Sequence, residues 1–218
     1  MMHEVSSRLR GAARILLSRK PVASRIGENR LSDPTIMKLK ELSLGSGLRV
    51  NLGCGTDYRS GWLNIDGSAS LPKVDKVLRL PNEPLDEALG SGVADYILAN
   101  DVVEHVRHWE GVNFLGQIYR TLKPGGGVEI RVPDCEYILA NNFWSTEQKL
   151  VLLFGGQDIP QGRDAKMDGS RAIHPEFFCH AFGWTMRRMK QDMLETGFRQ
   201  CAFRRSDSNF VAYAIKPE

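Results

Sequence analysis

Residues 48–55 (LRVNLGCG) are a short apolar run that ends in a glycine turn, and they leave few folds open to this chain. Turn-forming residues bound the run on both sides, GSG before and GTD after, which is typical of a buried parallel strand. Gly53 and Gly55 permit backbone angles that a side chain forbids, and they let a ligand approach the main chain. Ligands in open α/β sheets bind beyond the carboxyl ends of the strands. The turn is therefore a candidate ligand site.

A dinucleotide is the first ligand to consider for such a turn, and the spacing disfavours it. The dinucleotide fingerprint needs a third glycine and a full helix whose N-terminus holds the pyrophosphate. Here Tyr58 replaces the third glycine, and only residues 56–61 separate the turn from the next predicted strand, 62–66. A ligand without phosphate groups fits better. Asp66, which ends that strand, can accept hydrogen bonds from two ribose hydroxyls, or it is a turn residue before Gly67.

A series of motifs resembles the class I S-adenosylmethionine-dependent methyltransferases. It consists of NLGCG and GWLNID at 51–55 and 61–66, DVVEHV at 101–106, YRTLKPGGG at 119–127 and VPD at 132–134. The likeness is greatest to a bacterial subgroup with a shortened first helix, and it is strong over residues 48–134. It implies a doubly wound α/β fold, in which a mostly parallel, Rossmann-like seven-stranded sheet of order 3-2-1-4-5-7-6 carries helices on both faces.

The same resemblance implies the cofactor and the residues that bind it. S-adenosylmethionine would contact Asn51, Gly53, Cys54, Gly55, Asp66, Leu80, Asn100 and Asp101. Asp66 would hold the ribose, while Asn100 and Asp101 would border the sulfonium and the incoming nucleophile. The chain departs from the family at Asn51, where an acid is more usual, and at Arg79, where an aspartate usually lies near the adenine. Backbone groups would then make the adenine contact.

Asp101 and His180 are the candidate catalytic residues. Asp101 follows the predicted strand 93–99 and can take a proton from a hydroxyl as a general base. The alternative is that it caps a helix beginning at Val102. His180, like His174, is a candidate for a general base, for substrate contact or for a purely structural role. Methyl transfer is a displacement at an activated carbon, so positioning alone can supply most of the rate.

Glu104, His105 and His108 also suggest a metal site. His105 and His108 are spaced i, i+3 and could share one helix face, but zinc needs a third protein ligand. The family resemblance implies a packed helix start here instead. We therefore predict no metal.

Residues 31–218 are predicted to form a single methyltransferase domain. Beyond the motifs we expect strands at 74–80, 93–99, 128–132, 198–203 and 210–215, and helices from Pro34 to Gly45, at 85–89, over 135–154 and after Thr185. The last helix would bury Met186, Met189, Met193 and Leu194 on one face. The last two strands would form an antiparallel hairpin because their loop is short. Residues 155–174 are irregular, so we expect a lid-like insertion at about 155–183.

The positive charge lies almost entirely in residues 1–30, which carry seven Lys/Arg and two Asp/Glu. This basic extension could place an amphipathic helix on an anionic membrane, pack on the domain, or be an organelle transit peptide. The remaining chain is nearly neutral, so no nucleic-acid partner is expected. Four scattered cysteines and the absence of a signal-peptide pattern predict a cytoplasmic protein.

The acceptor is the least constrained part of the prediction. The resembling proteins are often associated with surface polysaccharides, so we expect methyl transfer, most readily to oxygen, on a small-molecule or glycan acceptor. Methylation of a nucleic-acid base is disfavoured because no Asn/Asp-Pro-Pro-aromatic motif follows residues 93–99. The alternative is a non-catalytic binding or adaptor module that retains the methyltransferase fold. The sequence leaves the oligomeric state open.

Overall fold

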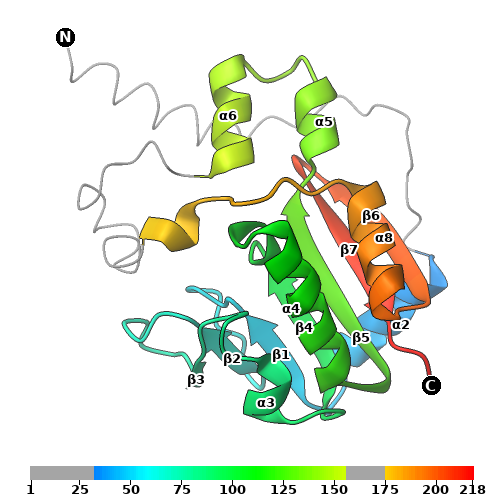
Figure 1. Cartoon of the computed structure of the whole chain (residues 1–218). Coiled ribbons are helices and arrows are strands. Elements are labelled where there is room, and N and C mark those ends of the chain that lie inside the picture. Colours follow the sequence, from blue (N-terminus) through cyan, green and yellow to red (C-terminus); the bar gives the residue numbers. More distant parts are fainter. Residues whose placement is uncertain (1–31, 156–174) are drawn as a thin grey trace.

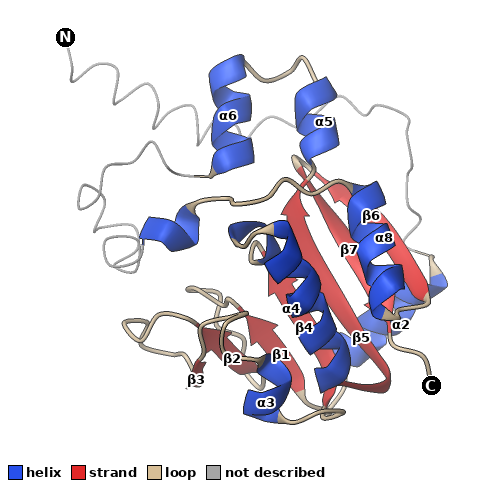
Figure 2. Cartoon of the chain, viewed as in Figure 1, coloured by secondary structure: helices blue, strands red, loops and turns tan. Residues whose placement is uncertain are grey.

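The computed structural model describes residues 32–155 and 175–218, and Figures 1 and 2 show its elements. A seven-stranded sheet of order β3-β2-β1-β4-β5-β7-β6 lies at its centre. The strands are β1 (Arg49–Leu52), β2 (Leu63–Asp66), β3 (Lys76–Val77), β4 (Ala94–Asn100), β5 (Leu122–Pro133), β6 (Gln200–Ser206) and β7 (Asn209–Ile215). The predicted strand order and α/β class are confirmed. The basic extension at 1–30, His174 and most of the predicted lid lie outside the described residues.

Helices cover both faces of the sheet (Figure 1). One face carries α3 (Leu85–Leu89), α4 (His108–Thr121) and α8 (Met186–Thr196), and the other carries α2 (Pro34–Leu44). Two helices and two 3-10 turns lie toward the carboxyl ends of the parallel strands: α5 (Cys135–Ala140), α6 (Thr146–Phe154), η1 (Val103–His105) and η2 (Pro175–Phe178). Within the described ranges, no helix combines the length and hydropathy that crossing a bilayer would require.

The alternating side chains of β4 build a core on each face of the sheet. Tyr96 and Leu98 pack in one buried cluster with Leu39 of α2. Ile97 packs in the other cluster, with Phe114 of α4. Successive side chains of a strand point to opposite faces, so the part of a strand that is covered on both sides is apolar. This explains why residues 96–99 (YILA) do not alternate between apolar and polar residues.

Strands β1 to β5 pair in parallel, and β7 is inserted antiparallel between β5 and β6. The predicted hairpin is confirmed, with Asp207 in the left-handed region at φ 55° in its turn. β4 and β7 agree with prediction to within one residue, while β5 begins earlier than predicted and β6 begins later. The carboxyl ends of β1, β2 and β4 consequently meet at one edge of the sheet.

The predicted strand at 74–80 is wrong in extent, because β3 is only Lys76–Val77. Among the described strands it pairs with β2 alone, through Ile65 and Asp66. At Arg79 the backbone N–H donates to the Glu83 carboxylate at 2.6 Å, and the Arg79 carbonyl accepts from the Glu83 N–H at 3.0 Å. These two bonds turn the chain away from the sheet.

The predicted helix over 135–154 is also wrong, because the chain breaks it into α5 and α6. Asn141 ends α5, and its side chain accepts from the Phe143 N–H. Ser145 begins α6 by accepting from the Gln148 N–H, while the Gln148 side chain accepts from the Ser145 N–H. This reciprocal cap is a helix-start signal, so a second helix begins inside the predicted span.

Two smaller expectations also change. No α-helix begins at Val102: a 3-10 turn, η1, precedes α4, which begins at His108. In α8, Met189 and Met193 are buried as predicted, and Thr185 caps the helix. Leu194, however, is 37% exposed and lies off the buried face, because adjacent helical positions are about 100° apart around the axis.

Candidate functional site

The glycine turn after β1 contains one closely packed glycine, Gly53, and one with free space around it, Gly55. Gly53 and Gly55 both have positive φ, 58° and 49°. A Cβ on Gly53 would lie 2.5 Å from a Val102 methyl group, whereas a Cβ on Gly55 would meet no described atom within 4 Å. Gly53 therefore allows the turn to pack against the segment after β4. Gly55 leaves its backbone open to a ligand.

Asp66 at the end of β2 is fixed beside this turn. One carboxylate oxygen accepts from the Gly55 N–H at 2.9 Å, and the other accepts from the Ser68 N–H at 2.9 Å. Each oxygen can accept more than one hydrogen bond, so both retain capacity for ligand hydroxyls. These two hydrogen bonds thus fix the Asp66 carboxylate, and it can still accept hydrogen bonds from a ligand.

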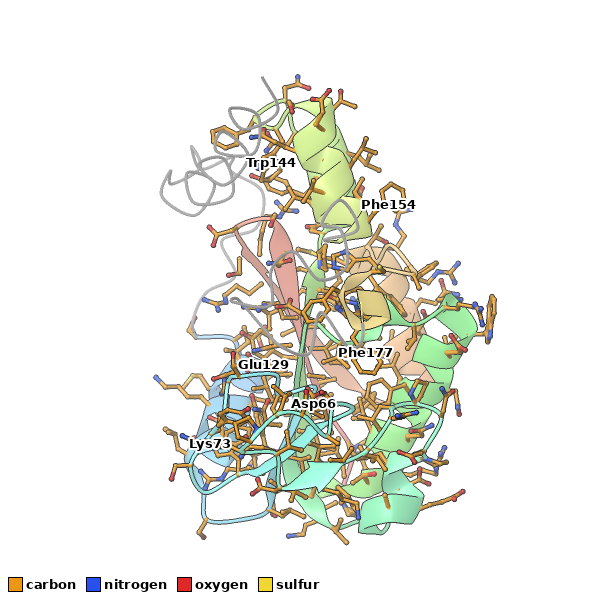
Figure 3. The ribbon with its side chains drawn as sticks, turned by 90° about the vertical axis from the view of Figure 1, so that its left-hand side faces the viewer. Asp66, Lys73, Glu129, Trp144, Phe154 and Phe177 are labelled. Carbon is orange, nitrogen blue, oxygen red and sulfur yellow. The ribbon has the colours of Figure 1, made fainter. Side chains whose placement is uncertain are left out.

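Phe177 of η2 reaches the same edge of the sheet. A Cβ on Gly67 would lie 3.3 Å from the Phe177 ring, and Figure 3 shows Phe177 near Asp66. The described end of the predicted lid therefore lies over the residue that follows Asp66.

Asn51 stabilises the turn through hydrogen bonds of its buried side chain. Its side chain is 2% exposed, and its amide nitrogen donates to the Asp57 carbonyl at 2.8 Å and to the Asn64 side-chain oxygen at 3.2 Å. Asn64 in turn binds Asp75. A carboxylate at position 51 has no proton to donate to either oxygen, which explains the departure from the family's usual acid.

The predicted cofactor contacts also include two less polar side chains, Cys54 and Leu80. Burial raises the pKa of the Cys54 thiol to about 12, with the Asp66 carboxylate adding to the effect, so this side chain stays neutral. Leu80 is half-buried and packs against the main core. It comes just after the point where Arg79 turns the chain. Arg79 itself is exposed.

Asn100 and Asp101 close the opposite side of the site, at the end of β4. The Asn100 side-chain oxygen is buried and has no hydrogen-bond partner in the part of the chain that the structure describes. Asp101 has φ 55°, and its carboxylate accepts from the Nε of Arg131 at 3.0 Å and from the Nη2 of the same guanidinium. The carboxylate raises the pKa of Arg131. The capping alternative for Asp101 is wrong, since Val102 is the N-cap of η1 and no side-chain bond caps it.

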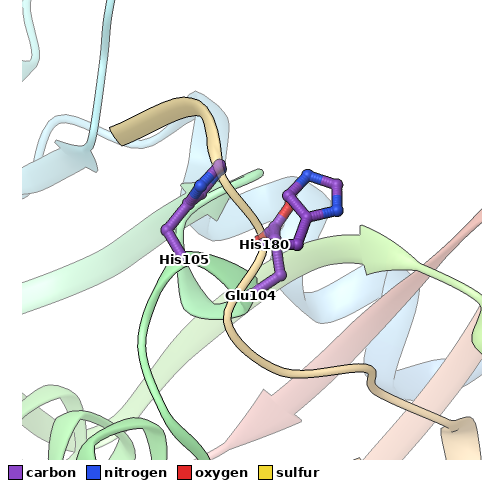
Figure 4. Close-up of side chains that lie close together, drawn as sticks. All are labelled: Glu104, His105 and His180. Atoms are coloured by element: carbon purple, nitrogen blue, oxygen red, sulfur yellow. The ribbon is translucent and has the colours of Figure 1, made fainter. Parts of the chain in front are cut away.

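His180 joins a second cluster, with Glu104 and His105 (Figure 4). One potential ligand atom from each of the three lies within 4.8 Å of those of the other two. Glu104 is 1% exposed, and neither of its carboxylate oxygens has a hydrogen-bond partner among the described residues. Burial raises its pKa well above the usual range, with Asp101 adding to the effect. Burial lowers the pKa of both histidines.

The two histidines whose i, i+3 spacing suggests a shared metal site, His105 and His108, have different partners. The His108 Nε2 lies 2.8 Å from a carboxylate oxygen of Asp192 in α8, so this ring is engaged elsewhere. His180 takes its place beside His105, with ring centroids 5.0 Å apart. The i, i+3 spacing could not reveal this partner, because only the tertiary fold brings the segment after η2 back to η1.

Known proteins resemble this chain in family and fold. A family model described as a methyltransferase domain matches residues 38–199, while no curated protein sequence matches significantly. A SAM dependent methyltransferase from Archaeoglobus fulgidus has TM-score 0.51 and 13% identity, over 83% of this chain and 93% of its own. One from Mesorhizobium loti has TM-score 0.51 and 13% identity, over 85% and 99%.

A third solved structure, the CurJ carbon methyltransferase, has TM-score 0.52 and 15% identity, and the match spans 79% of this chain but 49% of that one. At such identities these structures show the fold alone. The family model is the stronger finding because it spans most of the chain. The chain therefore belongs to the methyltransferase-domain family, as a class I S-adenosylmethionine-dependent methyltransferase.

Proposed function

We propose that S-adenosylmethionine binds along the carboxyl ends of β1, β2 and β4. The observation that carries this placement is the buried Asn100 oxygen, since an unpaired buried acceptor is costly and needs a donor. The ammonium group of the cofactor is such a donor. The proposed contacts are Asn51, Gly53, Cys54, Gly55, Asp66, Leu80, Asn100 and Asp101. Asp66 would bind the ribose and Leu80 the adenine, while Asn51 would act by holding the turn.

The proposed acceptor is an oxygen of a small molecule or glycan, with surface polysaccharide biosynthesis in the cytoplasm as the setting. The resemblance to a bacterial subgroup supports it, as does the nearly neutral charge of residues 31–218. A membrane contact through residues 1–30 belongs to the same proposal and lies outside the described residues. The same proposal treats residues 31–218 as one domain, in which residues 155–183 would cover the acceptor as a lid.

The bound cofactor would supply a methyl group already activated by the sulfonium, so the main task of this chain is positioning. Asp101 would accept the proton of the acceptor hydroxyl as its oxygen attacks the methyl carbon. Arg131 would hold the carboxylate in place through the ion pair seen here. The products would be the methyl ether and S-adenosylhomocysteine, with the proton passing from Asp101 to solvent.

Calorimetric titration with S-adenosylhomocysteine tests the cofactor site, with NAD as the control. Micromolar affinity for the first ligand and none for the second is expected. A folded protein that binds neither would contradict the proposed site.

Transfer of a radiolabelled methyl group to a panel of sugars, nucleotide sugars and small hydroxylated metabolites tests the acceptor. Label on oxygen supports the proposal. Label found only on carbon or nitrogen would refute O-methylation while leaving the cofactor site intact.

A further inference from the structure

The Glu104 carboxylate is the least satisfied polar group near the site. It is almost completely buried, and both of its oxygens lack a hydrogen-bond partner within residues 32–155 and 175–218. Buried polar groups in native proteins are nearly always bonded, and an exception calls for an explanation such as a missing ion. The groups nearest to these oxygens therefore indicate what they bind.

Two histidine rings face Glu104, and both are held by main-chain oxygens. The Nδ1 of His105 lies 3.0 Å from the Cys179 carbonyl oxygen, and the Nδ1 of His180 lies 3.2 Å from the Leu153 carbonyl oxygen. A carbonyl only accepts, so each Nδ1 carries the proton and each Nε2 keeps its lone pair. Bonds of this kind orient the histidine ligands of metal sites.

The segment that carries His180 is tied to Glu104 by the backbone. The Glu104 carbonyl accepts from the N–H groups of Ala181 at 2.8 Å and Phe182 at 3.2 Å. His105 is the next residue in η1. The three side chains thus come from two short segments that hydrogen bonds hold together, and Figure 4 shows them converging.

We propose that Glu104, His105 and His180 bind a divalent transition-metal cation. Potential ligand atoms within 4.8 Å of one another approach the spacing of about 3.4 Å that tetrahedral ligands have with bonds of about 2.1 Å. Small side-chain rotations would close the difference. Two imidazoles and one carboxylate suit zinc and its neighbours in the first row, whereas magnesium prefers oxygen ligands alone.

We infer that the cation takes part in methyl transfer, and this catalytic role rests on the proposed function. Three protein ligands leave a coordination position open. Asp101 follows the end of β4 and lies two residues before η1, which carries Glu104 and His105, so the cluster lies near the proposed base. An acceptor hydroxyl at the open position would bind the cation through oxygen and become more acidic. Its proton would pass to Asp101, and its oxygen would attack the methyl carbon.

Metal binding is tested directly on the full chain after chelator treatment and dialysis. Co²⁺ titration followed by visible absorption, and Zn²⁺ titration in competition with an indicator dye, should each show one site per chain. Glu104→Gln and His180→Ala should weaken binding by about 100-fold or more, since even outer partners of a metal ligand are worth about 10–100-fold. His108→Ala is the matched control and should bind as the wild type does, because His108 is engaged with Asp192.

Circular dichroism first establishes that each variant is folded. If His180→Ala does not fold, Glu104→Gln, which keeps the shape of the side chain, still tests the site. Absence of a stoichiometric site in the wild type would overturn the proposal. Unchanged affinity in Glu104→Gln would overturn it as well. So would a loss in His108→Ala equal to the loss in the other two variants.

The role in the reaction is tested separately from the proposed function. Titration of the metal-stripped protein with S-adenosylhomocysteine should give the same affinity as the untreated protein, while methyl transfer falls at least tenfold and returns with Zn²⁺ or Mn²⁺. Transfer that is unaffected by stripping would overturn the catalytic role. Failure to bind S-adenosylhomocysteine in any form would refute the proposed function, and the cobalt spectrum would still decide the metal site.

Discussion

The two sides of the site differ in how their polar groups are satisfied. On the β1–β2 side, Asp66, Asn51 and Asn64 each bond to neighbouring groups of the same loop system. On the β4 side, the Asn100 oxygen and the Glu104 carboxylate are buried without partners among the described residues. A self-satisfied network keeps its shape without a ligand, whereas an unsatisfied group gains most when a ligand arrives. The first side is therefore a preformed support, and the second is where ligands act.

Gly53→Val introduces a side chain at a crowded point of the β1–β2 side, and we expect the largest loss of stability from it. The new Cβ would lie 2.5 Å from a Val102 methyl group, at a φ of 58° that a β-branched residue avoids. Strain and overpacking together should cost about 3–5 kcal/mol of unfolding free energy, measured by urea titration.

Gly55→Ala is the matched control, since its φ is also positive but no described atom lies within 4 Å of the new Cβ. Its cost should be about 1–2 kcal/mol, the backbone term alone. Equal losses in the two variants would show that the contact with Val102 does not matter.

Asp101→Asn separates the two sides by function. If Asp101 takes the acceptor proton, turnover should fall by about 100-fold or more, while affinity for S-adenosylhomocysteine stays within about threefold. Steady-state kinetics and calorimetry on the same preparation measure both quantities. Loss of affinity alone, with turnover preserved at saturation, would leave Asp101 as a cofactor contact only and remove it as a base.

These two sides also differ in how well the sequence predicts them. The turn, Asp66 and the end of β4 follow from local apolar runs and from motifs that resemble a known family. Asn51 and Arg79 depart from that family, and only the structure shows that Asn51 donates where an acid would fail. The sheet order came from the resemblance, because no local pattern specifies which strands become neighbours.

The sequence predicts least where non-local contacts or capping outweigh periodicity. The i, i+3 spacing points to His105 and His108 as a pair, yet the fold brings His180 beside His105. The cap at Ser145 begins a second helix within the predicted helix over 135–154. The cap is a local signal and was available in the sequence. The partner of His105 lies 75 residues further along the chain, so no local pattern in the sequence predicts it.

Asp66→Ala tests whether the β1–β2 side contributes to the affinity for the cofactor product. Removing the carboxylate should weaken binding of S-adenosylhomocysteine by about 1.5–3 kcal/mol, the range for hydrogen bonds to a charged group. Calorimetry measures the affinity, and a thermal melt shows whether the turn survives the loss of its bond to Gly55. A folded variant with unchanged affinity would remove Asp66 from the site.

Glu104→Met should have the smallest effect, and its sign should be opposite. The substitution replaces a buried carboxyl, which has no hydrogen-bond partner in the described part of the chain, by an apolar side chain of similar size. The metal-free protein should therefore gain about 1–2 kcal/mol of stability. Urea titrations with chelator and with saturating Zn²⁺ measure it. Zinc should stabilise the wild type and leave the variant unchanged, because a ligand that binds only the folded state adds to its stability. A loss of stability in chelator would mean that Glu104 has a partner within the fold. The support and the ligand-binding side would then be satisfied alike, and the contrast between them would fail.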